Sequence, residues 1–185
     1  SYFTKCLQVS HVEVNGKVLG VVGSGTFGRE VIKVAQALGM KVLAYTRTPR
    51  ADEDNLKYVS LEELLKQSDY ISLHCPLTPQ TRHMINKETI AMMKPTAYII
   101  NTGRGALIDE PALIEALKEG RIAGAGLDVQ ETEPPVQDNP LYDMPNVILT
   151  PHMGWKGLET RQRLVSILAA NIQAFDEGRP QNVVS

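Results

Sequence analysis

The sequence has few of the features that mark secreted, membrane or nucleic-acid-binding proteins. Only two of its 185 residues are cysteines, Cys6 and Cys75, and they show no CxxC spacing. This argues against a disulfide framework or a zinc site and favours a reducing cytoplasm. No apolar run approaches the roughly 20 residues of a membrane span, and no signal-peptide pattern is present. The 19 basic and 21 acidic residues give a net charge of −2 without blocks of like charge. We therefore expect no metal, no membrane partner and no nucleic-acid partner.

A glycine-rich turn stands between an apolar run and a helical pattern. It follows residues 18–22 directly and reads Gly23-Ser24-Gly25-Thr26-Phe27-Gly28. In such a setting the first glycine takes a tight turn, the second admits a pyrophosphate to the backbone, and the third lets helix and strand pack closely. The amides at the helix start and the helix dipole favour the anion. The pattern predicts a dinucleotide site.

Strand-length apolar runs recur along the chain with helix-sized gaps between them. They lie at residues 18–22, 41–45, 70–74, 97–101, 124–128 and 147–149. Continuous rather than alternating apolarity is typical of strands buried on both faces, as in a parallel sheet. Repeated strand–helix units predict an α/β fold of the Rossmann type. We expect a doubly wound parallel sheet with helices on both faces, in one domain over residues 1–185.

The segments between these runs carry helix-start signals. Ser60 with Glu63 forms a capping-box pattern, Asn86 precedes a short helix, and Asp109 is placed to cap another. The last helix is expected to begin near Trp155. In the first helix we expect one apolar face toward the sheet, made of Phe27, Val31, Val34, Ala35 and Leu38.

Further stretches give the chain a family resemblance. They are His74-Cys75-Pro76-Leu77-Thr78, residues 101–108, residues 124–129, Glu131-Thr132-Glu133-Pro134 and Thr150-Pro151-His152-Met153-Gly154. With these stretches, in this order, the chain resembles the cofactor domain of the D-isomer-specific 2-hydroxyacid dehydrogenases. The resemblance covers nearly the whole chain and is far more specific than the glycine turn alone.

The resemblance implies a catalytic set of Arg104, Glu133 and His152. A guanidinium at Arg104, in a loop that follows a strand, can hold the carboxylate of a 2-oxo acid in a bidentate manner. His152 corresponds to the general acid that protonates the ketone oxygen, and Glu133 to the carboxylate that orients it. Taken singly, each has another interpretation: a solvated arginine, a helix-capping histidine, and a role that Glu131 could fill in place of Glu133.

The resemblance also implies a set of cofactor contacts. Thr26 and Phe27 offer backbone amides to the pyrophosphate, and Asp128 accepts a hydrogen bond from the nicotinamide carboxamide. We expect a structural or cofactor-adjacent role for His74, and His83 is expected to be an ordinary surface residue. The other implied positions beside the adenosine or the nicotinamide are Cys75, Pro76, Thr81, Thr102, Gly103, Arg104, His152 and Gly154.

The end of the second apolar run departs from an NAD-specific site. Thr46 stands where an acidic residue is expected, about 20 residues beyond the glycines, and Arg47 and Arg50 follow it. An acid would repel a 2′-phosphate, whereas threonine and arginine can bind one. We therefore expect NAD(P)H with a preference for NADP(H). The alternative is two solvated arginines with NAD tolerated.

The resemblance further implies that a second domain is missing. Family members have a separate, mostly N-terminal substrate domain, and residues 2–4 resemble the stretch after the link to it. The chain thus resembles a cofactor domain excised from a larger enzyme, expected to bind cofactor but to turn over little. The full-length protein is expected to be a homodimer.

Trp155 is the one clue to the substrate, because a tryptophan there resembles the glycerate dehydrogenases and the hydroxypyruvate or glyoxylate reductases. Hydroxypyruvate, glyoxylate or D-glycerate is expected as the substrate, with D-lactate second; alternatively, Trp155 only fastens the last helix.

Two other functions stay open. One is an NAD(H)-dependent binding protein without catalysis, as in the corepressors that resemble this family. The other is a Rossmann domain with vestigial catalytic residues.

Overall fold

The computed structural model describes residues 12–48 and 50–184. These residues divide into two compact units, with the boundary between Leu149 and Thr150. One domain over residues 1–185 stays a prediction. Residues 2–4, with their resemblance to an interdomain link, lie outside the described residues.

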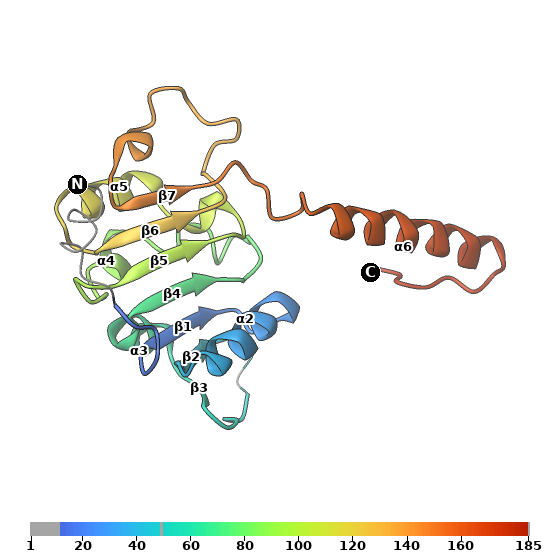
Figure 1. Ribbon diagram of the computed structural model, residues 1–185, viewed down its shortest axis with the longest axis horizontal. Coiled ribbons are helices and arrows are strands. Elements are labelled where there is room, and N and C mark those ends of the chain that lie inside the picture. Colours follow the sequence, from blue (N-terminus) through green and yellow to red (C-terminus); the bar gives the residue numbers. More distant parts are fainter. Residues whose placement is uncertain (1–11, 49, 185) are drawn as a thin grey trace, which may run out of the picture. The chain divides into compact units, whose positions relative to one another are not determined.

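The larger unit contains a seven-stranded sheet in which every neighbouring pair is parallel (Figure 1). The strand order is β3-β2-β1-β4-β5-β6-β7, so the order reverses between β1 and β4. This confirms the predicted doubly wound parallel sheet. The strands are β1 (Val18–Val22), β2 (Lys41–Tyr45), β3 (Leu56–Tyr58), β4 (Tyr70–Leu73), β5 (Tyr98–Asn101), β6 (Gly124–Leu127) and β7 (Val147–Leu149).

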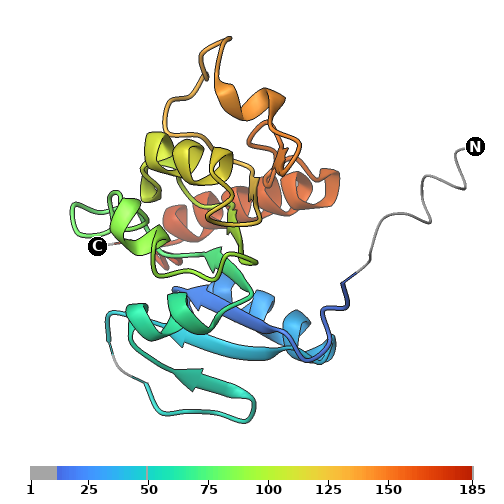
Figure 2. The same cartoon turned by 90° about the vertical axis from the view of Figure 1, so that its left-hand side faces the viewer.

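Helices cover both faces of this sheet (Figures 1 and 2). Alternate strand residues point to opposite faces. Leu19 and Val21 pack with Ile32 of one helix, whereas Val22 belongs to the core around the other helices. Helix α2 (Thr26–Ala37) thus lies on one face, and α3 (Leu61–Gln67), α4 (Lys87–Ile90) and α5 (Glu110–Lys118) lie on the other.

The predicted helix starts are confirmed at three caps. Ser60 Oγ accepts from the Glu63 amide at 3.1 Å, and Asn86 caps α4 in a reciprocal box with Thr89. Asp109 Oδ1 accepts from the third residue of its helix at 3.1 Å. These side chains satisfy amides that have no partner within the helix, and they explain why each helix begins where it does.

The predicted inner face of α2 was wrong for three of its residues. Phe27, Val34 and Leu38 are 80%, 61% and 54% exposed, whereas Gly28 and Ile32 are buried. The reason is the close approach of the helix to β1: a Cβ at Gly28 would lie 2.0 Å from the Gly23 carbonyl oxygen. Because only the glycine side of the helix can make this contact, Phe27 is turned outward.

The smaller unit contains the last helix, α6 (Leu158–Asp176). It begins three residues after Trp155, whose indole Nε1 donates to the His152 carbonyl at 2.9 Å. The Arg161 guanidinium lies over the Trp155 ring, 5.6 Å from its centroid. These contacts tie Trp155 to the first turn of α6. No helix within residues 12–48 and 50–184 is long and apolar enough to cross a membrane.

Candidate cofactor and active site

The predicted site residues of the larger unit lie in loops that follow β1, β2, β4, β5 and β6 and in the first turn of α2. In an open parallel sheet, ligands bind at the carboxyl ends of the strands, where the strand order reverses. Here that point lies between β1 and β4. The turn after β1 and the loop after β4 touch, because a Cβ at Gly23 would lie 2.7 Å from the Cys75 amide nitrogen.

The glycine turn has the backbone that the sequence predicts. Gly23 has a positive φ of 99°, in the region that favours glycine. A Cβ added at Gly25 would meet no described atom within 4 Å, so this position opens to free space. Gly25 caps α2 without a side-chain hydrogen bond, and the first turn of α2 contains no acid. The turn therefore fits a pyrophosphate, which would approach Gly25 and accept from the amides of Thr26 and Phe27.

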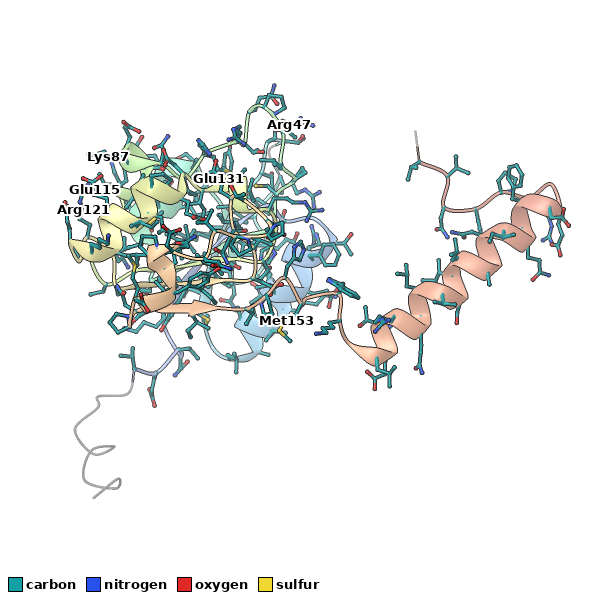
Figure 3. All side chains as sticks on the ribbon, turned by 90° about the horizontal axis from the view of Figure 1, so that it is seen from above. Arg47, Lys87, Glu115, Arg121, Glu131 and Met153 are labelled. Carbon is teal, nitrogen blue, oxygen red and sulfur yellow. The ribbon has the colours of Figure 1, made fainter. Side chains whose placement is uncertain are left out.

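The loop after β2 presents two cations. Arg47 and Arg50 are exposed, and no ion pair within the described part of the chain involves either of them. Figure 3 shows Arg47 at the outside of the larger unit. The Thr46 hydroxyl donates to the carbonyl of Thr48.

Two of the acids that follow these arginines, Asp52 and Glu53, have other partners. Asp52 Oδ1 accepts from the Tyr58 amide of β3 at 2.8 Å, and Glu53 forms an ion pair with Arg29 at 3.2 Å. These contacts hold the two carboxylates in the turn before β3. Neither of these two carboxylates therefore pairs with Arg47 or Arg50.

The loop after β4 is closed by side-chain hydrogen bonds. Thr81 Oγ1 donates to the Pro76 carbonyl at 2.7 Å and accepts from the Thr78 amide at 2.8 Å. His74 Nε2 lies 2.8 Å from Ser72 Oγ, and burial lowers the pKa of His74. Burial also raises the pKa of the Cys75 thiol. These hydrogen bonds hold the loop in place beside the glycine turn. The Cys75 thiol stays protonated near neutral pH.

Asn101, which ends β5, shapes the turn that carries Arg104. Its amide nitrogen donates to the Arg104 carbonyl at 2.9 Å, and its amide oxygen accepts from the Gly103 amide at 3.0 Å. Asn101 is 1% exposed, whereas Arg104 is exposed, with a guanidinium nitrogen donating to the Gly103 carbonyl at 2.8 Å. Thr102 is also exposed. A buried amide thus holds a turn whose arginine reaches solvent.

The loop after β6 carries Asp128 and Glu133. Asp128 is buried, and its amide donates to the Asn101 carbonyl at 2.9 Å. Glu133 Oε1 accepts from the Gln130 amide at 3.1 Å. A Cβ at Gly105 would lie 1.9 Å from the Gln130 carbonyl oxygen. The structure therefore brings the loops of Arg104 and Glu133 into direct contact.

Glu131 and His83 are functional candidates whose place the sequence did not reveal. His83 Nε2 donates to Glu131 Oε1 at 2.6 Å, and Arg82 donates to the same oxygen at 3.0 Å. His83 is therefore not an ordinary surface residue. Glu131, considered as a substitute for Glu133, has its carboxylate bonded to the side chains of His83 and Arg82. The sequence pattern could not indicate this contact, because His83 and Glu131 are 48 residues apart.

The smaller unit carries the remaining predicted residues, His152, Gly154 and Trp155. The His152 amide donates to the Thr150 carbonyl at 3.0 Å, and its φ is 49°, a left-handed conformation unusual for a non-glycine residue. Such conformations gather at functional sites. In the described residues, no three His, Cys, Asp or Glu side chains form a group that could hold a metal ion.

Comparison with known proteins agrees with this geometry. Two relatives match at 49% identity, the hydroxypyruvate reductase of Blautia hydrogenotrophica and the glycerate dehydrogenase of Methylorubrum extorquens. The first match covers 94% of this chain and 55% of the relative, and the second covers 93% and 54%. The chain thus spans about half the length of the curated relatives it matches.

Solved structures are similar throughout the chain. The D-lactate dehydrogenase of Lactobacillus jensenii with NAD⁺ is 37% identical, with a TM-score of 0.89 over 95% of this chain and 58% of that one. An acyclic imino acid reductase in complex with NADPH and D-Arg is 36% identical, with a TM-score of 0.87 over 100% of this chain and 61% of that one. A profile of the D-isomer specific 2-hydroxyacid dehydrogenase NAD binding domain matches residues 3–154. The chain therefore belongs to the D-isomer specific 2-hydroxyacid dehydrogenases and contains their NAD-binding domain.

Proposed function

We propose that this chain is the cofactor-binding part of an NAD(P)H-dependent reductase of short 2-oxo acids, which yields D-2-hydroxy acids. The observation that carries the proposal is a series of contacts at one edge of the sheet. Gly23 lies against Cys75, Gly105 lies against Gln130, and the His83 amide donates to the Ala106 carbonyl, so the glycine turn and the loops after β4, β5 and β6 form one continuous rim. A cofactor held at the turn would extend along the residues that the reaction needs.

In the proposed reaction, each residue of the catalytic set has a separate task. The Arg104 guanidinium binds the substrate carboxylate and fixes which face of the ketone is presented. The reduced nicotinamide supplies the hydride for the carbonyl carbon, and His152 gives its proton to the carbonyl oxygen. Glu133 orients His152 and favours its protonated form. In the reverse direction, His152 takes the hydroxyl proton.

The proposed cofactor preference is NADP(H). Thr46, Arg47 and Arg50 supply a hydroxyl and two cations where an NAD-specific site has a carboxylate, and the neighbouring Asp52 and Glu53 bind other groups. A 2′-phosphate would therefore meet two guanidinium groups that neither of these acids pairs with. Of the two solved structures named above, one is with NAD⁺ and the other is in complex with NADPH, so the fold accommodates both.

Hydroxypyruvate and glyoxylate are the proposed substrates, with D-glycerate as the reverse substrate of the first and D-lactate second. Trp155 supports this choice, because its ring is held beside His152 by the bond to the His152 carbonyl. An aromatic wall next to the proton donor suits a short, uncharged tail. The relatives named hydroxypyruvate reductase and glycerate dehydrogenase have substrates of this kind.

We propose that the enzyme works in the cytoplasm as a homodimer and that the part matched here turns over little by itself. Since the chain spans about half of its relatives, the groups that enclose the substrate come from outside it. An open site keeps water around the charged groups and weakens every contact that the reaction uses.

The test joins this chain to the part of the Blautia reductase that it does not match. The joined protein is expected to oxidise NADPH with hydroxypyruvate or glyoxylate, with pyruvate slower, whereas the chain alone binds cofactor with negligible turnover. Turnover by the chain alone at the rate of the joined protein would contradict the need for enclosure. Cofactor binding with no reduction of any 2-oxo acid by the joined protein would favour the non-catalytic binding protein.

A further inference from the structure

The loop that carries Glu133 has no regular secondary structure of its own. It runs from Asp128, after β6, to Asn139, which precedes the 3₁₀ helix η2 (Pro140–Asp143). Loops of this kind are ordinarily the more mobile parts of a protein. A carboxylate that must orient a histidine needs a fixed position, so something must hold this loop.

Glu131 is bonded to two other parts of the larger unit, the loop after β4 and the start of α5. One carboxylate oxygen accepts from His83 Nε2 at 2.6 Å and from Arg82 at 3.0 Å, in the loop after β4. Its backbone amide donates to Glu110 Oε2 at 3.1 Å, at the start of α5. Its side chain is only 21% exposed, so these charge-assisted bonds are partly shielded from water.

A second anchor closes the far end of the loop. Asn139 is 4% exposed, and its amide nitrogen donates to Glu110 Oε1 at 2.8 Å and to Gln130 Oε1 at 3.1 Å. Glu110 thus binds both ends of the segment that contains Glu133. Just before the first anchor, the backbone amide of Gln130 donates to Glu133 Oε1, and the carbonyl of Gln130 lies against Gly105.

The loop after β4 is itself fixed to the loop of Arg104. His83 has a φ of 50°, and its amide donates to the Ala106 carbonyl at 2.8 Å. Ile85 continues the connection, donating to the Leu107 carbonyl at 3.1 Å. A bond from Glu131 to His83 therefore connects the loops after β4, β5 and β6.

We propose that Glu131 is a positioning residue, which holds the loop of Glu133 against the loop of Arg104 through His83, Arg82 and Glu110. This inference rests on the proposed function, because it gives Glu133 a reaction to serve. Glu131 touches neither substrate nor cofactor in this role. It fixes the separation between the carboxylate that orients the proton donor and the guanidinium that binds the substrate.

The test compares Glu131→Ala with Glu131→Gln, His83→Asn and a matched control, Glu115→Ala. Glu115 likewise accepts from two basic side chains, Lys87 at 3.3 Å and Arg121 at 2.9 Å. Figure 3 shows these three residues together on one side of the larger unit, away from Glu131. Asparagine at position 83 tolerates the left-handed backbone and is too short to reach Glu131.

The first measurement is amide hydrogen exchange of the chain itself, residue by residue. In Glu131→Ala, exchange at Gln130 and through the segment to Asn139 is expected to rise about tenfold or more, with His83→Asn intermediate. Glu131→Gln keeps an acceptor oxygen for Arg82 and His83 and restores most of the protection. Glu115→Ala leaves the segment unchanged. Equal exchange in wild type and Glu131→Ala would overturn the inference.

The second measurement uses the joined protein described above. Glu131→Ala is expected to lower kcat about 10- to 100-fold with little change in KM for NADPH, since only the catalytic geometry is loosened. Faster exchange with an unchanged kcat would make Glu131 merely structural and would overturn the positioning role. If the joined wild-type protein reduces no 2-oxo acid, the proposed function fails, while the exchange data still decide whether Glu131 holds the loop.

Discussion

Gly25 and Gly28 stand three residues apart in one turn, yet their surroundings differ completely. A Cβ at Gly28 would lie 2.0 Å from a carbonyl oxygen, whereas a Cβ at Gly25 would enter free space. Gly25 also has an ordinary φ of −73°. Gly28 is therefore required by the fold, and we propose that Gly25 is required by the ligand.

Alanine at each position separates these roles. Gly25→Ala is expected to change the free energy of unfolding by less than about 1 kcal/mol while weakening NADPH binding about tenfold or more, because the methyl group occupies the pyrophosphate's place. Gly28→Ala is expected to destabilise the fold by about 2 kcal/mol or more through the backbone clash. Thermal unfolding and calorimetric titration measure the two effects; full NADPH affinity in Gly25→Ala would contradict the assignment.

His74 gives a pH dependence with a defined sign. Burial lowers its pKa below the ordinary 6.5, so the unfolded chain binds this proton more readily than the folded chain. The contribution of His74 to the free energy of unfolding is therefore fully present above pH 6.5. It declines as the pH falls below 6.5, until the folded form is also protonated. His74→Gln is expected to lack this component. Unfolding free energies of both proteins from pH 5 to 8 test it, and parallel pH profiles would refute it.

At the scale of elements, Asn101 shows how a strand end positions a loop. Both ends of its buried amide are bonded within the turn of Arg104. Asn101→Ala is expected to cost about 1–3 kcal/mol and also to weaken cofactor binding. Ser60→Ala, which removes the cap of α3, is expected to cost about 1 kcal/mol with binding unchanged. If both variants lost stability and kept full cofactor affinity, the turn would have no role in the site.

The sequence was informative where structure is local or strongly apolar. The six predicted strands are confirmed within one residue at each end, because strands buried on both faces read as unbroken apolar runs. Strand β3 was not predicted, since its three residues, Leu56, Lys57 and Tyr58, alternate in polarity at the sheet edge. The orientation of α2 was missed because a backbone contact at Gly28, rather than the largest apolar side chains, sets it.

The candidate site could be predicted in part for the same reasons. Motif residues such as Gly23, Asn101 and Asp128 lie at strand ends, as their places in the sequence indicate. The role of Glu131 could not be predicted, because its contacts with Arg82 and His83 join segments almost fifty residues apart. Only the folded sheet brings those loops to one edge.

At the scale of the whole molecule, the proposed chemistry divides between the two units. Arg104 and Glu133 belong to the larger unit, and His152 and Trp155 to the smaller. In this proposal, cofactor binding needs chiefly the larger unit, with its glycine turn and the arginines after β2. Binding of the dinucleotide is therefore the property that the chain should keep even though it spans about half of its relatives.

The most direct test is calorimetric titration of the chain with NADPH and with NADH. We predict that both bind and that NADPH binds about tenfold tighter, or about 1.4 kcal/mol, with the difference abolished in the Arg47→Ala, Arg50→Ala double variant. Tighter binding of NADH would contradict the 2′-phosphate site at Thr46, Arg47 and Arg50. Binding of neither cofactor would contradict the account as a whole.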